Sequence, residues 1–248
     1  MKKRFRKVVL LIMVAAISTN FSSCIKNLNQ SNASEVAILL REKYGEEFIV
    51  HSIGDRLASD GANVLTAYCS SKSKSNVIFE ARMNSEKELV YDNYPIKILC
   101  DQARGLINNN LDKTKNNYYT TVSISKLIRD VDPSNADISK VIIENNGLLL
   151  TFDIYICECI EADSLYDEIL STFQYFYNLD KTISIGAKVW NLKGEHFTQC
   201  TNELSVAPDI SETVLYKMNP IGNVNFALID GEPSIEKINF TNAVMGIS

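Results

Sequence analysis

Four residues in the C-terminal half of the chain carry side chains that zinc chemistry uses. Cys157 and Cys159 are separated by one residue, and His196 and Cys200 follow further along the chain, four residues apart. Thiolate sulfur and imidazole nitrogen are common zinc ligands in proteins. The set could therefore hold a metal ion or support a thiol-dependent reaction.

The spacing of the two neighbouring cysteines argues against a shared zinc ion. Cys157 and Cys159 lie in a segment expected to form a strand, where residues two apart point to the same face about 7 Å apart. Two sulfurs on one zinc ion lie closer, roughly 3.8 Å for tetrahedral bonds of about 2.3 Å. The strand separation also disfavours a Cys157–Cys159 disulfide. We expect free thiols that act as small hydrophobic side chains; the alternatives are a disulfide to Cys200, from another strand, and a zinc site.

The rest of the chain offers no recognisable catalytic set. It contains no Gly-x-Ser-x-Gly or His-Glu-x-x-His sequence and no glycine-rich phosphate loop. His51, the only other histidine, lies in an apolar segment typical of a core strand. Cys69 and Cys100 could bridge a strand to a helix or stay free, and we favour a free Cys100. We therefore predict that the chain is not an enzyme and has no catalytic residue, cofactor or metal ligand.

The first 23 residues follow the pattern of a secretory signal peptide. A basic head precedes an apolar run over residues 8–17, and small residues precede the expected cut. The basic residues are Lys2, Lys3, Arg4, Arg6 and Lys7. The apolar run is too short to span a bilayer comfortably. Residues 24–33 are polar, so we expect them to form a tether.

The end of this segment, Phe21-Ser22-Ser23-Cys24, resembles the lipobox of bacterial lipoproteins. In that family the cysteine thiol receives a diacylglycerol and becomes the mature N-terminus. The resemblance implies a lipid attachment site at Cys24 and a location at the extracytoplasmic face of the cell membrane. It makes the membrane a partner through that anchor, and an envelope protein a candidate second partner. The alternatives are an ordinary secretory signal with an incidental Cys24 and a transmembrane anchor.

The composition is that of a globular protein with an acidic surface. Hydrophobic residues make up 46% of the chain and charged residues 22%. Without residues 1–23, which hold five basic and no acidic residues, 20 basic and 30 acidic side chains remain, a net charge of −10. Such a surface repels nucleic acid, so we expect no nucleic-acid partner. Five cysteines remain beside Cys24, so at least one is free unless two chains are joined.

Hydrophobic periodicity predicts a first α+β unit over residues 34–112. A helix is expected over 32–45, three strands over 48–53, 64–69 and 77–83, and a second helix from Pro95 onward. The expected order is therefore α-β-β-β-α. Leu99 should face the sheet from the second helix.

The segment from Arg41 to Phe48, Arg-Glu-Lys-Tyr-Gly-Glu-Glu-Phe, reads as a helix end that runs into a strand. It is similar to the small α-β-β-β modules, cystatin-like in shape, of uncharacterised lipoproteins of Gram-positive bacteria. The resemblance implies no activity. The Gln-x-Val-x-Gly loop with which true cystatins block papain is absent.

The pattern predicts a second α+β unit over residues 113–248, with a β-α-β-β-α-β-like order and extra C-terminal strands. The strongest hairpin signal joins residues 138–144 and 148–159 through Asn146-Gly147. A helix opened by Ser164 should bury Phe173. The other expected elements are a strand over 118–122, a helix over 124–131, and strands over 183–189, 224–229 and 235–240.

These observations leave three hypotheses for function. The first is a membrane-anchored, non-catalytic binding or interaction module. The second is a metal- or thiol-dependent envelope enzyme that uses Cys157, Cys159, His196 and Cys200. The third is a solute-binding lipoprotein, although two larger α/β lobes around a cleft are not evident here.

Overall fold

The computed structural model describes residues 30–54, 64–111, 116–125, 128, 131–159, 161–205 and 210–247. The predicted signal peptide, Cys24 and most of the tether lie outside these residues. The helix expected over 124–131 is wrong where it is described, because Ile124 ends a strand (Asn117–Ile124) and residues 125, 128 and 131 are not helical; its other four residues lie outside the described ranges. The described residues contain no helix that is both long enough and apolar enough to cross a membrane.

The chain divides into two compact units, which confirms the predicted two-unit α+β class. Unit 1 comprises residues 1–75 and 80–92, and unit 2 comprises residues 76–79 and 93–248. We expected the second helix to belong to the first unit. The division instead groups α2 (Tyr94–Asn110) with unit 2, because α2 packs against β5, α3 and α4 of that unit.

Unit 1 contains a helix over residues 30–44 and a four-stranded sheet in the order β1-β2-β3-β4. The strands are β1 (Phe48–Gly54), β2 (Leu65–Ser71), β3 (Phe79–Met83) and β4 (Leu89–Asp92). Val36 and Leu40, from the predicted helical stripe, are buried. The helix ends at Gly45, whose φ of 72° suits a residue without Cβ.

Strand β4 was not expected from the sequence. It is four residues long, and a tight turn joins it to β3. The side chain of Asn84 forms this turn by accepting hydrogen bonds from the backbone N–H groups of Glu86 and Glu88. Unit 1 therefore holds one more strand than the predicted α-β-β-β module.

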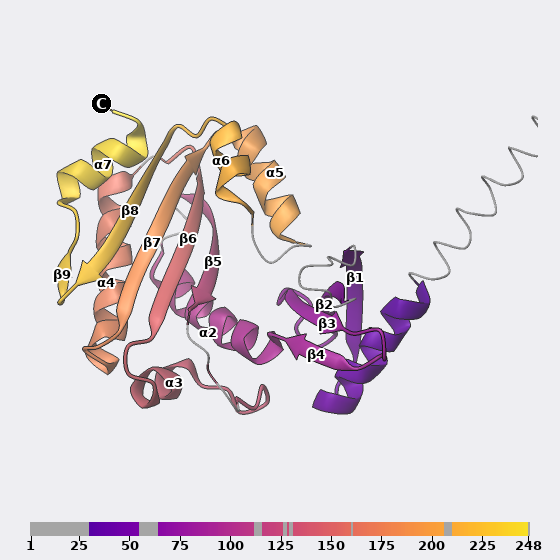
Figure 1. Ribbon diagram of the computed structural model, residues 1–248. Helices are drawn as coiled ribbons and strands as arrows, with labels where there is room; N and C mark the ends of the chain where they lie inside the picture. Colours follow the sequence, from indigo (N-terminus) through magenta and orange to yellow (C-terminus); the bar gives the residue numbers. More distant parts are fainter. Residues whose placement is uncertain are drawn as a thin grey trace, which may run out of the picture. The chain divides into compact units, whose positions relative to one another are not determined.

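Unit 2 is built on a five-stranded sheet in the order β5-β6-β7-β8-β9 (Figure 1). Its strands are β5 (Asn117–Ile124), β6 (Leu149–Cys157), β7 (Ser184–Leu192), β8 (Gly222–Ile229) and β9 (Glu232–Pro233). Its helices beside α2 are α3 (Ile138–Glu144), α4 (Ala162–Leu179), α5 (Gly194–Leu204), α6 (Glu212–Lys217) and α7 (Lys237–Met245). Strands β6 and β7 are parallel, joined through α4, and the other neighbours are antiparallel.

The predicted hairpin around Asn146-Gly147 is wrong, because its first arm is helix α3. Asp137 caps this helix by accepting hydrogen bonds from the N–H groups of Ser139 and Lys140. Ile138, Val141 and Ile142 are buried at helical spacing. Gly147, with φ of 68°, turns the chain from the helix into β6.

Two further expectations about the C-terminal half are wrong. Residues 235–240 do not form a strand: helix α7 begins at Lys237 and buries Phe240 and Val244, which are four residues apart. Cys200 does not lie on a strand but on α5, a helix that the sequence analysis missed. The strand expected over 224–229 is confirmed as part of β8.

The two faces of the sheet in unit 2 are covered differently. Leu150, Phe152 and Ile154 of β6 alternate with residues of the other face and pack with α2, α3, α4 and α7 in the main core. Tyr155 and Trp190 point to the other face and pack with α5 and α6 in a smaller core. Figure 1 shows α4 and α7 on the side of the sheet away from α5 and α6. Phe173 lies in the main core, as predicted.

Candidate binding site

The structure separates the cysteines that the sequence analysis considered together. Strand β6 ends at Cys157, and Glu158 has a positive φ of 51°, so the two thiols do not share a strand face. Cys159 lies in the main core, whereas Cys157 and Cys200 belong to the smaller core on the other face of the sheet. The expectation of two thiols on one face is therefore wrong.

All five cysteines of the described residues are free thiols. Burial is the main cause that raises the pKa of Cys69 and Cys200 to about 12 and that of Cys100 and Cys159 to about 11. Thiols of this kind carry almost no thiolate at neutral pH and are poor nucleophiles.

His196 and Cys200 lie one turn apart on helix α5, whereas His51 lies in unit 1. His196 stands on the first turn of α5, where its Nε2 lies 3.7 Å from a carboxylate oxygen of Glu195. In unit 1, His51 is hydrogen-bonded to the hydroxyl of Ser70 at 2.8 Å. Within the described ranges, no three His, Cys, Asp or Glu side chains are grouped so that they could hold a metal ion.

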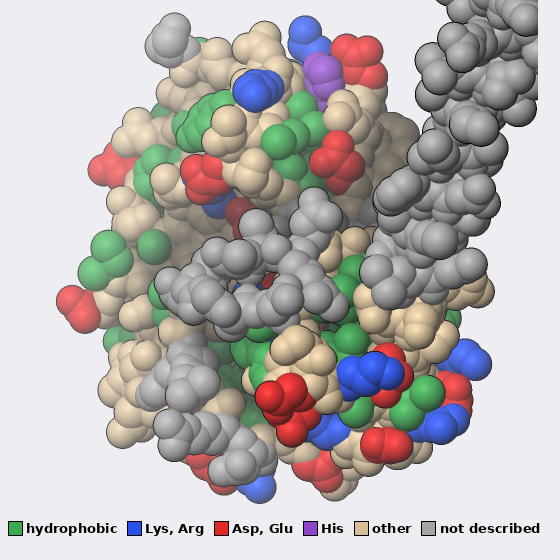
Figure 2. Space-filling model, turned by 45° about the vertical axis from the view of Figure 1, so that its right-hand side comes forward, with side chains coloured by type: hydrophobic (Ala, Val, Ile, Leu, Met, Phe, Trp, Pro, Cys, Tyr) green, Lys and Arg blue, Asp and Glu red, His purple; other side chains and the backbone are tan. Residues whose placement is uncertain are grey.

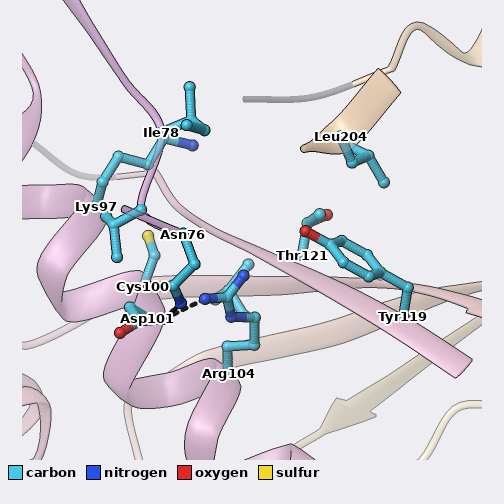
Figure 3. Close-up of a pocket in the computed structure, with 11 residues that line it drawn as sticks. Asn76, Ile78, Lys97, Cys100, Asp101, Arg104, Tyr119, Thr121 and Leu204 are labelled. Atoms are coloured by element: carbon cyan, nitrogen blue, oxygen red, sulfur yellow. Dashed lines mark hydrogen bonds and ion pairs between the residues drawn. The ribbon is translucent and has the colours of Figure 1, made fainter. Parts of the chain in front are cut away.

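A small pocket lies beside α2 in unit 2 (Figure 3). Its volume is about 50 Å³, and Lys97, Asp101 and Arg104 of α2 line it together with Tyr119 and Thr121 of β5. Arg104 is paired with Asp101, which also accepts a 3.5 Å hydrogen bond from Asn76. Ligand sites usually have volumes of about 300–1,000 Å³. This pocket is too small for an organic ligand, and its Arg104 charge is already neutralised.

A larger hollow lies on the half of the sheet of unit 2 that α5 and α6, the described helices on this face, do not cover. Its volume is about 380 Å³, which falls within the range of ligand sites. We call this surface the open shelf. Its floor is formed by Thr151 and Asp153 of β6, Gly186 and Lys188 of β7, and Asn225 and Ala227 of β8; Glu212 of α6 and Ser234 stand at its rim.

Strand register places polar side chains of the open shelf in one row. Asp153 lies opposite Lys188, and Lys188 lies opposite Asn225. Thr121 of β5, which lines the small pocket, continues this row opposite Asp153. Because neighbouring strands lie about 4.8 Å apart, the row presents hydroxyl, carboxylate, ammonium and amide groups at regular intervals. The next row along β6 and β7 on this face pairs Tyr155 with Trp190, which are buried in the smaller core.

Gly186 makes the floor of the open shelf hollow. A Cβ atom at this position would lie 3.3 Å from the carbonyl oxygen of Phe226 and 3.6 Å from the Cβ of Ala227. The neighbouring residue across the register is Ala227, which is also small. Two small residues side by side leave room above the sheet where long side chains would otherwise stand.

Lys188 is the best-fixed side chain of the open shelf. Its Nζ lies 2.7 Å from a carboxylate oxygen of Glu212 and 4.9 Å from the ring centroid of Trp190. It also lies 5.8 Å from the ring centroid of Tyr216, and its side chain is only 17% exposed. An ammonium group held in this way can donate a hydrogen bond in a defined direction but has little net charge to offer an anion.

Charge elsewhere on the molecule is also mixed. On the face that Figure 2 shows, basic and acidic side chains are interspersed and do not gather into a patch of one sign. Ion pairs of unit 1 include Lys43 with Asp92 at 2.7 Å and Lys87 with Glu35 at 3.2 Å. This distribution offers no basic track for a phosphate backbone on that face.

The open shelf was not predicted from the sequence. Its residues come from three strands whose pairing cannot be read from spacing alone, and the predicted hairpin put β6 in the wrong pair. A signal was present at Lys188 and Asn225, which are polar residues at the centres of alternating strands. The lipid attachment site predicted at Cys24 lies outside the described residues.

The fold and the open shelf define a two-unit α+β protein with a half-covered sheet. Residues 33–137 match the model of a family described as a domain of unknown function, DUF5037. A crystal structure of a DUF5037 family protein from Ruminococcus gnavus ATCC 29149 is similar to this chain, with a TM-score of 0.62 at 17% sequence identity. The similarity covers 86% of this chain and 99% of that one. No curated protein matches this chain.

The two comparisons cover different extents of the molecule. The residues that match the family model run from the first described helix through β5 and end before α3. All the residues that line the open shelf, from Thr151 to Ser234, therefore lie outside that match. At 17% identity, the structural similarity supports the fold alone.

Proposed function

We propose that the protein is a lipid-anchored, extracytoplasmic binding module without catalytic activity, and that the open shelf is its binding surface. The anchor rests on the sequence: the signal-like first 23 residues and the lipobox-like Phe21 to Cys24. The assignment of the binding surface rests on one structural observation: strand register aligns Asp153, Lys188 and Asn225 on the half of the sheet that α5 and α6 do not cover.

The chemistry of the open shelf supports binding over turnover. A general acid or base needs a proton-transfer group poised near neutral pH, and a nucleophile needs an activating neighbour. No histidine or cysteine lines the hollow. The ammonium of Lys188 is held by Glu212. Fixed donors and acceptors of this kind orient a bound molecule.

Detergent-phase partitioning tests the anchor. Expressed in a bacterium with its own leader, the full chain should enter the detergent phase, and Cys24→Ala should move to the aqueous phase. The matched control is Cys157→Ala, which should partition as the wild type does. A membrane fraction unchanged by Cys24→Ala would contradict the anchor.

Fluorescence tests the binding surface. Trp190 is the only tryptophan of the chain and lies next to Lys188, so an occupied open shelf should change its emission. The chain would be titrated with single polar probes: glucose, N-acetylglucosamine, acetate, inorganic phosphate and lysine amide. A saturable change with at least one probe, lost in Asn225→Ala, is the expected result. No change with any of them would contradict the assignment of the open shelf.

A further inference from the structure

We propose that the ligand of the open shelf is a neutral carbohydrate chain, held by the polar row and stacked on the ring of Tyr216. This inference rests on the proposed function and names the chemical class of its ligand.

The charges of the open shelf favour a neutral molecule. Its single cation, Lys188, lies 2.7 Å from Glu212, so an anionic ligand would have to compete with a carboxylate already in place. Glu212 is already engaged in this ion pair with Lys188. Asp153 also interacts with other groups of the protein. A cationic ligand would meet the ammonium of Lys188 beside Glu212, and an anionic ligand would meet the carboxylate of Glu212 beside Lys188. A neutral ligand encounters neither repulsion and leaves the pair intact.

The hydrogen-bonding groups suit a molecule with many hydroxyl groups. Sugar hydroxyls both donate and accept, so they need acceptors and donors side by side. Asn225 offers both through its amide and is exposed. Lys188 offers a donor, and Thr151 offers a hydroxyl. A row that contains both donors and acceptors can therefore pair with sugar hydroxyls more completely than a row of donors alone or of acceptors alone.

Tyr216 supplies a flat ring beside Lys188, next to the residues that line the hollow but not among them. The residue is 53% exposed, and its ring meets Trp190 edge-on, with centroids 5.1 Å apart and planes at 75°. It stands one helical turn after Glu212 on α6, so both side chains lie on the same side of that helix. Lys188 lies near both of them, 5.8 Å from the ring centroid of Tyr216. Because the ring is packed on one edge, a ligand that stacks on it loses little conformational entropy in fixing it. The C–H face of a sugar can cover the exposed apolar area of such a ring.

The floor and the volume fit a short saccharide. Gly186 and Ala227 leave a flat area beside the row, where a pyranose ring can approach the sheet. The hollow of about 380 Å³ lies at the lower end of the range for ligand sites. It therefore accommodates a few sugar units, while a longer chain would extend past the rim.

Titration calorimetry with three neutral trisaccharides tests the inference: chitotriose, cellotriose and maltotriose. At least one should bind the wild type. Tyr216→Ala and Asn225→Ala should each weaken that binding about tenfold or more, because each removes one principal contact. The matched control is Tyr175→Ala, which removes a tyrosine of similar exposure (44%) from α4 on the other side of the sheet. It should leave the affinity unchanged.

A cationic peptide, trilysine, and inorganic phosphate serve as the other arms. If either binds in a way that Asn225→Ala abolishes while no trisaccharide binds, the open shelf is a binding site and the carbohydrate inference is overturned. If none of the probes binds at the open shelf, both the carbohydrate inference and the proposed function are overturned. Trisaccharide binding that survives both shelf variants would also overturn the inference. Thermal melts of both variants, each at an exposed position, would show that they remain folded.

Discussion

Asn191 should be among the most sensitive positions in unit 2, although no chemistry is assigned to it. Its side chain is only 1% exposed and lies at the end of β7. The amide oxygen accepts a hydrogen bond from the N–H of Cys159 at 2.9 Å, and the amide nitrogen donates one to the carbonyl oxygen of Val244 at 3.0 Å. One side chain thereby ties the segment after β6 and the end of α7 to the central sheet.

The cost of Asn191→Ala follows from the two backbone groups that it abandons. A buried donor or acceptor left without a partner costs about 1–3 kcal/mol. Two such groups, the N–H of Cys159 and the carbonyl of Val244, give a loss of about 2–6 kcal/mol. Domains of this kind are stable by about 5–15 kcal/mol, so the variant should lose a large part of its stability.

Urea unfolding followed by Trp190 emission measures this loss. The matched control is Asn117→Ala, at an exposed position of β5, which should stay within about 0.5 kcal/mol of the wild type. Asn191→Leu should be as damaging as Asn191→Ala, because apolar filling does not restore the two hydrogen bonds. A loss below about 1 kcal/mol for Asn191→Ala would refute the reasoning, since it would mean that water or a shift of the backbone satisfies both groups.

Three further predictions test the packing of the core and the ionisation of its buried thiols. Leu99→Ala and Phe173→Ala should each cost about 2–5 kcal/mol in thermal melts, because both side chains are fully buried, and a loss near zero would contradict their burial in the core. Gly222→Ala should cost about 1–3 kcal/mol because its Cβ would overlap the carbonyl oxygens of Ala243 and Val244, whereas Gly105→Ala in α2 meets nothing within 4 Å and should stabilise; equal effects would contradict this. Burial raises the pKa of Cys69 and Cys200 from 9.0 to about 12, so the folded state retains protons that the unfolded state loses, and stability should fall as pH rises from 9 toward 12. The Cys69→Ala/Cys200→Ala variant should show a shallower fall of the urea midpoint over this range, and an identical slope would count against the burial argument.

The elements that the sequence predicted correctly are those with one unambiguous periodicity. Helix α4 buries Leu165, Ile169, Phe173 and Phe176 at a spacing that no strand could use. Strand β7 alternates from Ile185 to Val189, as the pattern predicted. In both cases local pattern and final burial agree, so the two-unit α+β class could be predicted from them.

The errors lie where a short apolar run fits two periods. Ile138, Val141 and Ile142 fit a helix, but the run over 138–144 followed by Asn146-Gly147 also fits a hairpin arm. The cap at Asp137 favours the helix over the hairpin arm. Helix α5 was missed because its buried stripe has three members, Phe197, Cys200 and Leu204.

The open shelf could not be predicted because it depends on long-range pairing. Asp153, Lys188 and Asn225 lie more than 30 residues apart along the chain and meet only through the parallel pairing of β6 with β7 and the register of β8. The hollow of the open shelf also depends on α5 and α6, which cover only one end of this face of the sheet. No local pattern encodes either feature.

The central claim is that the open shelf is where this protein binds its ligand, and amide chemical-shift mapping tests it most directly. The ¹⁵N-labelled chain without residues 1–23 would be titrated with chitotriose, cellotriose, maltotriose, trilysine and inorganic phosphate. The account predicts saturable shifts centred on Lys188, Asn225 and Ala227, and none centred on Tyr175 of α4. Saturable shifts centred away from the open shelf, or no shifts with any of these probes, would contradict it.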